Sequence, residues 1–231
     1  MNDLTLLYYT AHKLPDDCAE RVRAHLLESG AGLPIISVSQ KPLNFGENIC
    51  VGEIGQSFYN CYKQIYVGVQ KVKTPFVACC EDDTLYNPEH FAFRPAEDAF
   101  YYNKSMWYLE GVRKGVRRGG IFWHKWQTGM FGCITRADLL LKVLKKRFDF
   151  TPEEPMPRRH YATAGWQEPG RFDGERTEFF KTKIPLITFN YFNALGGKAR
   201  SVVHKPAEET YLDYWGDATK LKDNFWHGKN D

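Results

Sequence analysis

Short, almost wholly apolar runs alternate with segments of helical periodicity through the first eighty residues. Apolar runs of this length predict strands that are buried on both faces, as in parallel sheets. The expected strands are residues 4–9, 33–39 and 75–80, and the expected helices run from about 16 to 29 and from about 58 to 72, with a polar, glycine-containing loop at 40–55. This order predicts βαβ units and an α/β fold with a central, mostly parallel sheet flanked by helices.

Three consecutive acids, Glu81, Asp82 and Asp83, follow the third expected strand directly. In open parallel sheets, ligands bind beyond the carboxyl ends of the strands, and these acids stand at such an end. Carboxylates there repel one another and resist desolvation, so they favour a bound cation. Mg²⁺ or Mn²⁺ held by one or two protein carboxylates usually completes its coordination with water and substrate phosphates. The alternative is a helix cap or a surface turn, which acids also favour.

The second half of the chain has a less regular pattern. One or two strands are expected near residues 121–134, followed by a helix from about 136 to 146. Residues 151–174 contain four prolines and three glycines, which predicts a loop. A helical turn or two is expected at 175–182 and a strand at 184–190, before a polar C-terminal part.

The composition is that of a soluble globular protein. A chain of 231 residues can bury one sizeable core, and 43% hydrophobic and 26% charged residues are ordinary values. The N-terminus lacks a signal-peptide pattern, and no run approaches the roughly 20 apolar residues of a membrane span. The six cysteines show no CxxC spacing and are expected to be reduced thiols. Together these features predict a cytoplasmic protein.

Positive charge is concentrated in residues 111–147. This segment holds ten Lys or Arg against one acid, Asp138, although the whole chain carries only +3. Such asymmetry favours a basic face for an anionic partner. The alternative is an ordinary solvated helix surface.

The segment "TPFVACCEDDTLYNPEHF" resembles the metal-binding segment of nucleotide-sugar glycosyltransferases with the GT-A fold, and its acids are similar to an EDD variant of their DxD motif. Fainter likenesses follow in the family's order: "LTLLYYT" to the first strand, "TGMFGCITRADLLLKVLKKRFDF" to a later G-x-x-x-x-x-R-x-x-L segment, "FDGERTEFFKTKIPLITFN" to an acidic helix near the acceptor, and "FWHGKND" to a C-terminal His element. The resemblance implies one GT-A-like (Rossmann-like) domain over residues 1–231. Its nucleotide-sugar half extends to about residue 110, and an irregular acceptor-binding half with a C-terminal metal-site segment follows from about 111.

The resemblance also implies roles for the acids. Asp83 is expected to be the direct ligand of Mn²⁺ or Mg²⁺, while Glu81 and Asp82 hold the ion, its waters, the ribose or the donor sugar. His227 is the expected third protein ligand, with His204 as the competing choice, although a lone His is more often a surface or core residue. UDP is the commonest donor nucleotide of the family, so a UDP-sugar is the expected co-substrate. Further donor contacts are expected from Tyr9 and Thr10 at the base and from Lys229, Lys198, Arg200 and Lys205 near the phosphates.

An inverting transferase needs a carboxylate base to take the acceptor proton. The candidates are Asp173, Glu175 and Glu168 in "WQEPGRFDGERTE", and Asp173 is favoured because it precedes an expected helical turn. Helix capping is the alternative role for Asp173. A retaining enzyme needs no such base, and the sequence leaves the stereochemical course open.

Basic residues interleaved with aromatics suit phosphate contact and base stacking. The residues expected to bind the acceptor are Arg117, Arg118, Trp123, Lys125, Trp126, Arg158, Arg159 and Trp166. The favoured acceptor is a hydroxymethylated pyrimidine in phage-type double-stranded DNA, which places the protein in a bacterial or phage-infected cell and requires base flipping. A glycan, lipid-linked or protein acceptor is the main alternative, with the tryptophans stacked on sugar rings.

Two other classes of protein stay open. A metal-dependent nucleotidyltransferase also combines βαβ units with carboxylates at strand ends, but it normally carries a glycine-rich phosphate loop, which "TAHKLPDD" lacks. A noncatalytic nucleic-acid-binding domain would explain the basic segment but would leave the acids after the buried strand without a role.

Overall fold

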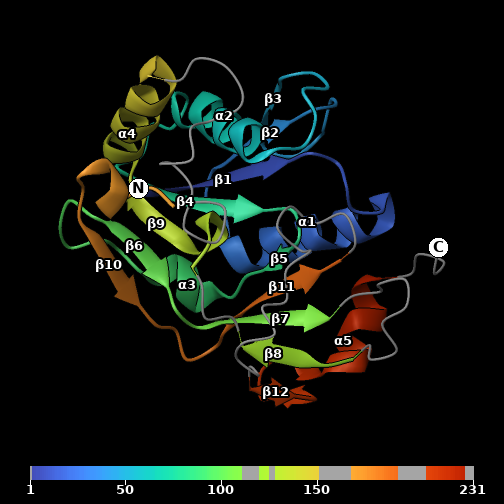
Figure 1. Cartoon of the computed structure of the whole chain (residues 1–231). Coiled ribbons are helices and arrows are strands. Elements are labelled where there is room, and N and C mark those ends of the chain that lie inside the picture. The colour runs from blue at the N-terminus through green and yellow to red at the C-terminus, as the bar shows by residue number, and fades with distance from the viewer. Residues whose placement is uncertain (1, 111–119, 125–127, 151–167, 192–206, 227–231) are drawn as a thin grey trace.

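The structure, a computed structural model, describes residues 2–110, 120–124, 128–150, 168–191 and 207–226 (Figure 1). The helices are α1 (Asp16–Gly30), α2 (Phe58–Val69), α3 (Pro88–Ala92), α4 (Ala137–Phe150) and α5 (Ala218–Phe225), with 3-10 turns η1 (Met130–Gly132) and η3 (Arg171–Asp173). The strands are β1 (Leu4–Thr10), β2 (Ile35–Ser39), β3 (Glu47–Cys50), β4 (Phe76–Glu81), β5 (Thr84–Leu85), β6 (Phe100–Asn103), β7 (Met106–Glu110), β8 (Phe122–His124), β9 (Cys133–Arg136), β10 (Thr177–Phe180), β11 (Leu186–Asn190), β12 (Glu208–Glu209), β13 (Tyr211–Leu212) and β14 (Gly216–Asp217).

The larger sheet has the strand order β10-β6-β9-β4-β1-β2-β3. Its strands pair in parallel except β9, which runs antiparallel to both of its neighbours. The chain steps outward from β1 to β2 and β3 and then returns to place β4 on the other side of β1. The junction of β1 and β4 is therefore the point at which the strand order reverses. The expected α/β class, with a mostly parallel central sheet flanked by helices, is confirmed.

A smaller sheet has the order β12-β8-β7-β11-β5. Only β7 and β11 pair in parallel within it, and β5 follows β4 almost directly. One face is apolar and packs against α1 and α5 through residues such as Leu109, Phe122 and Phe189. This second sheet was not predicted, because its outer strands are too short to produce a periodic signal.

Helices α1 and α2 cover opposite faces of β1 because its side chains, almost all apolar, point alternately to the two faces of the sheet. Leu4 and Leu6 pack with Leu26 of α1, whereas Leu7 packs with Ile65 of α2. Ser57 caps the N-terminus of α2, and its hydroxyl accepts the amide N–H of Asn60 at 3.1 Å. Such a cap satisfies one of the otherwise unpaired amides of the first helical turn.

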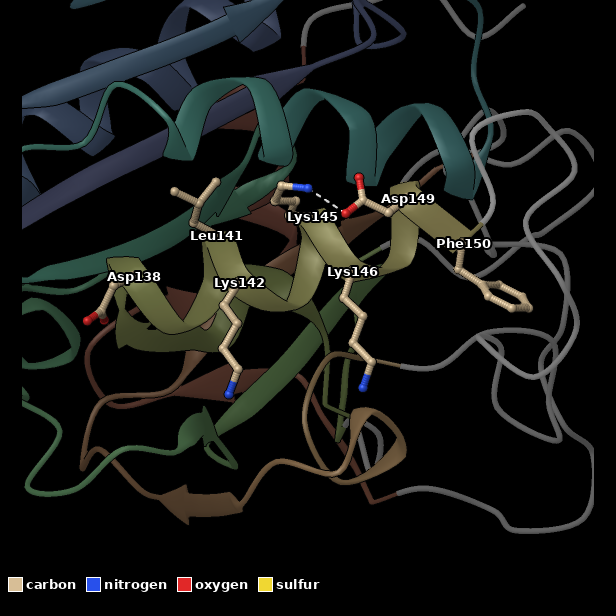
Figure 2. Close-up of a pocket in the computed structure, with 7 residues that line it drawn as sticks. All are labelled: Asp138, Leu141, Lys142, Lys145, Lys146, Asp149 and Phe150. Carbon is tan, nitrogen blue, oxygen red and sulfur yellow. Dashed lines mark hydrogen bonds and ion pairs between the residues drawn. The ribbon is translucent and has the colours of Figure 1, made fainter.

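Helix α4 packs on α2 and ends the basic segment. Its outer face forms a shallow, open depression (Figure 2) lined by Asp138, Leu141, Lys142, Lys145, Lys146, Asp149 and Phe150. Lys142 is ion-paired with Glu175 and Lys145 with Asp149, while Phe150 is exposed. This part of the basic segment therefore matches the alternative of a solvated helix surface.

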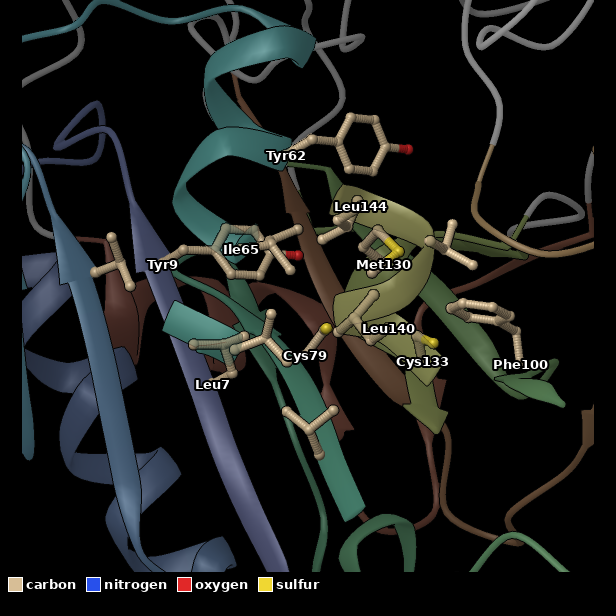
Figure 3. Close-up of a cluster of buried hydrophobic side chains, with 14 of the residues drawn as sticks. Leu7, Tyr9, Tyr62, Ile65, Cys79, Phe100, Met130, Cys133, Leu140 and Leu144 are labelled. Atoms are coloured by element: carbon tan, nitrogen blue, oxygen red, sulfur yellow. The ribbon is translucent and has the colours of Figure 1, made fainter. Parts of the chain in front are cut away.

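The core between the larger sheet, α2 and α4 combines aliphatic and aromatic side chains with sulfur-containing ones (Figure 3). Leu7 and Cys79 of the sheet meet Ile65 of α2 and Leu140 and Leu144 of α4. The second core cluster lies on the other face of the larger sheet, where Tyr86, Met106 and Leu186 pack against β1 and β4. Within the described ranges, every helix is too short or too polar to cross a membrane.

Two local expectations are wrong. Residues 40–55 were expected to be a loop, yet they contain β3, whose Asn48 amide donates to the hydroxyls of Ser37 and Ser39 on the neighbouring strand. Polar pairing of this kind leaves no hydrophobic alternation to detect. Residues 175–182 were expected to be helical, and with them the segment likened to an acidic helix, but they contain β10. The Thr and Phe residues of β10 favour a strand once β6 offers a partner.

Candidate functional site

The acids lie at the junction where the strand order reverses. Glu81 ends β4 and stands directly beside Tyr9 of β1 in the parallel register. The Tyr9 hydroxyl donates a hydrogen bond of 3.0 Å to Oε1 of Glu81. In doubly wound sheets this junction opens a crevice beyond the strand ends, which is where ligands bind.

Asp82 is held by the last residue of β1. The Thr10 hydroxyl donates to Oδ2 of Asp82, and the Thr10 oxygen in turn accepts the amide N–H of His12 at 2.9 Å. Burial raises the pKa of Asp82 to about 6, although the hydrogen bond from Thr10 opposes the shift. A carboxyl group in this position gains from a nearby positive charge, because a cation favours its ionised form.

Asp83 joins the acidic turn to the smaller sheet. It is only 8% exposed, and its backbone oxygen accepts the amide N–H of Phe189 of β11 at 2.8 Å. Its Oδ1 accepts the Thr84 hydroxyl at 3.3 Å. The Tyr86 hydroxyl accepts the amide N–H of Glu81 at 3.0 Å. These contacts fix the turn between the two sheets.

The donor atoms of this turn fit a hard divalent cation. Among the described residues no group of three or more His, Cys, Asp or Glu side chains is assembled as a ready metal site. Mg²⁺ and Mn²⁺ sites that complete their coordination with water and substrate phosphates need only one or two protein carboxylates. The acids from 81 to 83 offer carboxylate oxygens of this kind. A bound cation would also stabilise the ionised form of Asp82, which burial disfavours.

The negative charges of the acidic turn affect the pKa values of two groups on neighbouring elements. Burial raises the pKa of the Cys61 thiol on α2, and the carboxylates of Glu81 and Glu168 raise it further. Burial also raises the pKa of Tyr191, just beyond β11, and the charges of Asp82 and Asp83 add to this shift. The negative charges of the acidic turn therefore contribute to the raised pKa values of groups on α2 and just beyond β11.

Glu168, the first of the three candidate bases along the chain, is bonded to a tyrosine of α2. The Tyr62 hydroxyl of α2 donates to its Oε2 at 3.2 Å. The next residue along the chain, Pro169, accepts the Tyr102 hydroxyl on its backbone oxygen at 2.7 Å. Both tyrosines are almost fully buried, so they hold this segment against the core.

The other two candidate bases are engaged elsewhere. Asp173 forms a bidentate ion pair with Arg147 of α4, with Nε–Oδ1 and Nη2–Oδ2 distances of 2.7 Å. The two side chains are 6% and 1% exposed, and Asp173 also accepts the Gly170 amide N–H at 2.9 Å. Glu175 pairs with Lys142 on the surface of α4. These contacts favour structural roles, and a catalytic role for either residue stays a prediction.

Trp123, expected at the acceptor, lies on β8 of the smaller sheet and is half-buried. Its indole N–H donates to Oε2 of Glu110 at 3.0 Å, and its ring stacks on Tyr108 with centroids 4.2 Å apart. Glu110 is 2% exposed and also accepts the Asn190 amide at 3.1 Å. Sequence reasoning missed Glu110, yet "MWYLE" ends an apolar run with an acid just as "FVACCE" does.

The remaining predicted site residues lie outside the described residues. They are His204, His227 and Lys229 of the metal and donor sites, Lys198, Arg200 and Lys205 near the phosphates, and Arg117, Arg118, Lys125, Trp126, Arg158, Arg159 and Trp166 of the acceptor site.

No protein-family model matches the chain, and neither does any curated protein. Among solved structures, S. aureus TarS 1-349 in complex with UDP-GlcNAc aligns over 86% of this chain and 61% of its own, with 14% identity and a TM-score of 0.47. Drosophila β-1,4-galactosyltransferase 7 in complex with manganese, UDP-Gal and xylobiose aligns over 80% and 68%, with 14% identity and a TM-score of 0.40. The apo-form glycosyltransferase GlyE of Streptococcus pneumoniae TIGR4 aligns over 66% and 39%, with 14% identity and a TM-score of 0.39. The chain thus spans about three fifths of the TarS fragment, and the likeness is too distant to decide function.

Proposed function

We propose that the chain is a metal-dependent glycosyltransferase that moves a sugar from a nucleotide sugar, UDP-linked, to a hydroxyl acceptor. The observation that carries this proposal is the acidic turn from 81 to 83, held at the strand-order reversal by the hydroxyls of Tyr9 and Thr10. Fixed carboxylates at the carboxyl ends of these strands suit a diphosphate that arrives with a divalent cation.

The roles of the acids follow from how each one is held. Asp83, anchored through its backbone to Phe189, is the proposed direct ligand of Mn²⁺ or Mg²⁺. Glu81 and Asp82, oriented by Tyr9 and Thr10, hold the ion, the ribose or the donor sugar. When bound, the cation neutralises charge that develops on the leaving diphosphate. His227 or His204 is proposed as the further protein ligand.

The proposed base is Glu168. Both carboxylate oxygens of Asp173 are bonded to Arg147, whereas Glu168 accepts the hydroxyl of Tyr62 on α2 and, together with Glu81, raises the pKa of the Cys61 thiol. In an inverting transfer Glu168 takes the proton of the acceptor hydroxyl while the hydroxyl oxygen bonds to the anomeric carbon. The bond from that carbon to the diphosphate oxygen breaks, and its electron pair leaves with the nucleoside diphosphate.

The acceptor proposed from the sequence is a hydroxymethylated pyrimidine in double-stranded DNA. It is supported by the basic and aromatic composition of residues 111–147. A salt titration of duplex DNA binding tests it, because contacts to phosphates produce a steep loss of affinity with salt. Absence of binding at low salt would leave a glycan, lipid-linked or protein acceptor.

The donor proposal is tested by calorimetric titration of UDP, GDP, CMP and TDP, each with Mn²⁺ and with EDTA. We expect one nucleoside diphosphate to bind only with the metal, and this binding to be lost in Asp83→Asn. Asp16→Asn, which removes an exposed acid from the first turn of α1, is the matched control and should bind normally. If no nucleotide binds under any condition, the transferase proposal is wrong.

Product analysis separates the rival enzyme class. A glycosyltransferase releases a nucleoside diphosphate, whereas a nucleotidyltransferase releases pyrophosphate. With an active acceptor, Glu168→Gln should abolish transfer but leave nucleotide binding intact. A Glu168→Gln variant that transfers sugar at the normal rate would remove Glu168 from the role of base.

A further inference from the structure

The tyrosine that bonds to Glu168 is fixed by the core. Tyr62 of α2 is 2% exposed and donates its hydroxyl to Oε2 of Glu168 at 3.2 Å. In Figure 3 its ring extends from α2 with the hydroxyl directed away from the helix. The guanidinium carbon of Arg147 lies 5.3 Å from the centre of the same ring. Because the ring packs in the core cluster that α2 and α4 share, the hydroxyl is a donor with little freedom to move.

The backbone that follows Glu168 is anchored separately. Tyr102 of β6 donates its hydroxyl to the Pro169 oxygen at 2.7 Å. Gly170 comes next with a φ of 135°, a backbone conformation that favours glycine, and its amide N–H donates to Asp173 at 2.9 Å. The chain that carries Glu168 is therefore held independently of the contact that its carboxylate makes with α2.

Four titratable groups of the described core respond to the charge of Glu168. They are Cys61 and Tyr62 of α2, Tyr102 of β6 and Cys133 of β9. Burial raises the pKa of each, and the carboxylate of Glu168 raises it further. On α4, the guanidinium of Arg147 is always protonated and is bonded to Asp173. Tyr62 therefore keeps its proton, and stays a donor, through the pH range in which a carboxyl group titrates.

We propose that Tyr62 is a positioning residue that fixes the orientation of the Glu168 carboxylate and stabilises its ionised form. The inference rests on the proposed function, in which Glu168 is the base that takes the acceptor proton. A base must be ionised and within reach of the proton before it can act. A hydroxyl that donates to a carboxylate favours the charged form, and a donor locked by packing fixes its direction. Tyr62 acts through Glu168 in this role and needs no contact with the donor or the acceptor.

Three hydroxyl deletions separate this role from ordinary packing. Tyr62→Phe removes the hydroxyl and keeps the ring that packs in the core. Tyr102→Phe is the matched control, because its hydroxyl anchors the same segment through the Pro169 backbone rather than through the carboxylate. Tyr66→Phe, one turn further along α2, is the second control, since the Tyr66 ring packs on Phe148. Thermal unfolding verifies that the variants are folded.

The direct readout is NMR of protein labelled with ¹³C at the glutamate side-chain carboxyl, where the Glu168 signal is assigned by its loss in Glu168→Gln. We expect its pH midpoint to rise by about one unit in Tyr62→Phe, because loss of a hydrogen bond to a charged group disfavours the ionised form. Tyr102→Phe and Tyr66→Phe should leave the midpoint unchanged. An unchanged midpoint in folded Tyr62→Phe overturns the positioning role, since a merely structural hydroxyl affects stability alone.

Kinetics connect the contact with the proposed function. The probe reaction is release of UDP from UDP-GlcNAc, UDP-Gal or UDP-Glc with Mn²⁺ and with water as acceptor. Glu168 takes a proton of the water, the water oxygen bonds to the anomeric carbon, and the bond to the UDP oxygen breaks with its electron pair leaving on UDP. In Tyr62→Phe we expect the acid limb of kcat/KM to move with the NMR midpoint and kcat to fall about tenfold, with KM little changed.

The outcomes distinguish the two proposals. A raised midpoint, together with UDP release that is equal in Glu168→Gln and wild type, supports the positioning role and removes Glu168 from the role of base. An unchanged midpoint, together with UDP release that is lost in Glu168→Gln, leaves the base standing and overturns the role of Tyr62.

A second measurement applies if Tyr62→Phe is unfolded. With ¹³C at the hydroxyl-bearing carbon of tyrosine, one signal should shift with the same pH midpoint as Glu168, and this shift should disappear in Glu168→Gln. The titration is repeated in Tyr102→Phe, so that Tyr102 is not the source of the shift. If no tyrosine signal follows the Glu168 midpoint there, the positioning role is wrong.

Discussion

The buried ion pair between Arg147 and Asp173 allows a structural role of Asp173 to be separated from a catalytic one. Its two short hydrogen bonds are almost inaccessible to water, and a third contact ties Asp173 to the Gly170 amide. Removing one partner of such a pair leaves the other charge buried and typically costs about 3–5 kcal/mol. We therefore expect Asp173→Asn to lower the free energy of unfolding by about that amount, measured by urea titration at neutral pH.

A double substitution makes the test decisive. Replacing both partners with apolar residues, as in Arg147→Met with Asp173→Leu, removes the uncompensated charge and should recover most of the lost stability. If Asp173 only positions the segment that carries Glu168, the double variant should also recover sugar transfer. Glu175→Gln, which breaks a surface pair with Lys142, is the control and should change stability little. A stable Asp173→Asn protein without transfer activity would refute the reasoning and restore Asp173 as the base.

Three further predictions concern the stability of the fold. Burial lowers the pKa of His90 to about 3, so between its unfolded pKa near 6.5 and that value the unfolded state binds the extra proton. As the pH is lowered from about 6 to about 3, the free energy of unfolding should therefore decrease by about 1.4 kcal/mol per pH unit more steeply in wild type than in His90→Phe, and equal slopes in urea titrations would contradict this. Gly68→Ala should destabilise by about 1–3 kcal/mol in the same assay, because the new methyl group would lie 2.3 Å from Leu7 Cδ1, and an unchanged midpoint would show that the helix shifts freely. Asn87→Ala should cost about 1 kcal/mol or more, since its side chain caps α3 and donates to a backbone oxygen, and Asn87→Asp should retain the cap.

The fold of the first eighty residues could be predicted from the sequence because each apolar pattern there fits only one kind of element. Strands buried on both faces must be almost wholly apolar, as β1 and β4 are, and the helices beside them need only one apolar stripe. The carboxyl end of β4 follows from the same pattern, and with it the place of the acids. The bounds observed for α1, α2 and β4 agree with the expected ones to within a few residues.

The rest of the fold depends on partners that are distant in sequence. β10 becomes a strand because β6 lies beside it, and β12 and β13 are too short to carry a period. The pair of Arg147 and Asp173 joins positions 26 residues apart, and nothing in either local segment announces it. The local sequence pattern that favours Asp173 as the base therefore contains no sign of its ion pair with Arg147.

Glu81 and Glu110 occupy similar positions in the two sheets. Each acid ends an apolar strand, and each is fixed by the side chain of a paired strand: Glu81 by Tyr9 and Glu110 by Trp123. The chain between β4 and β5 spans only the acidic turn, so the strand ends that carry these acids belong to sheets that meet at Asp83.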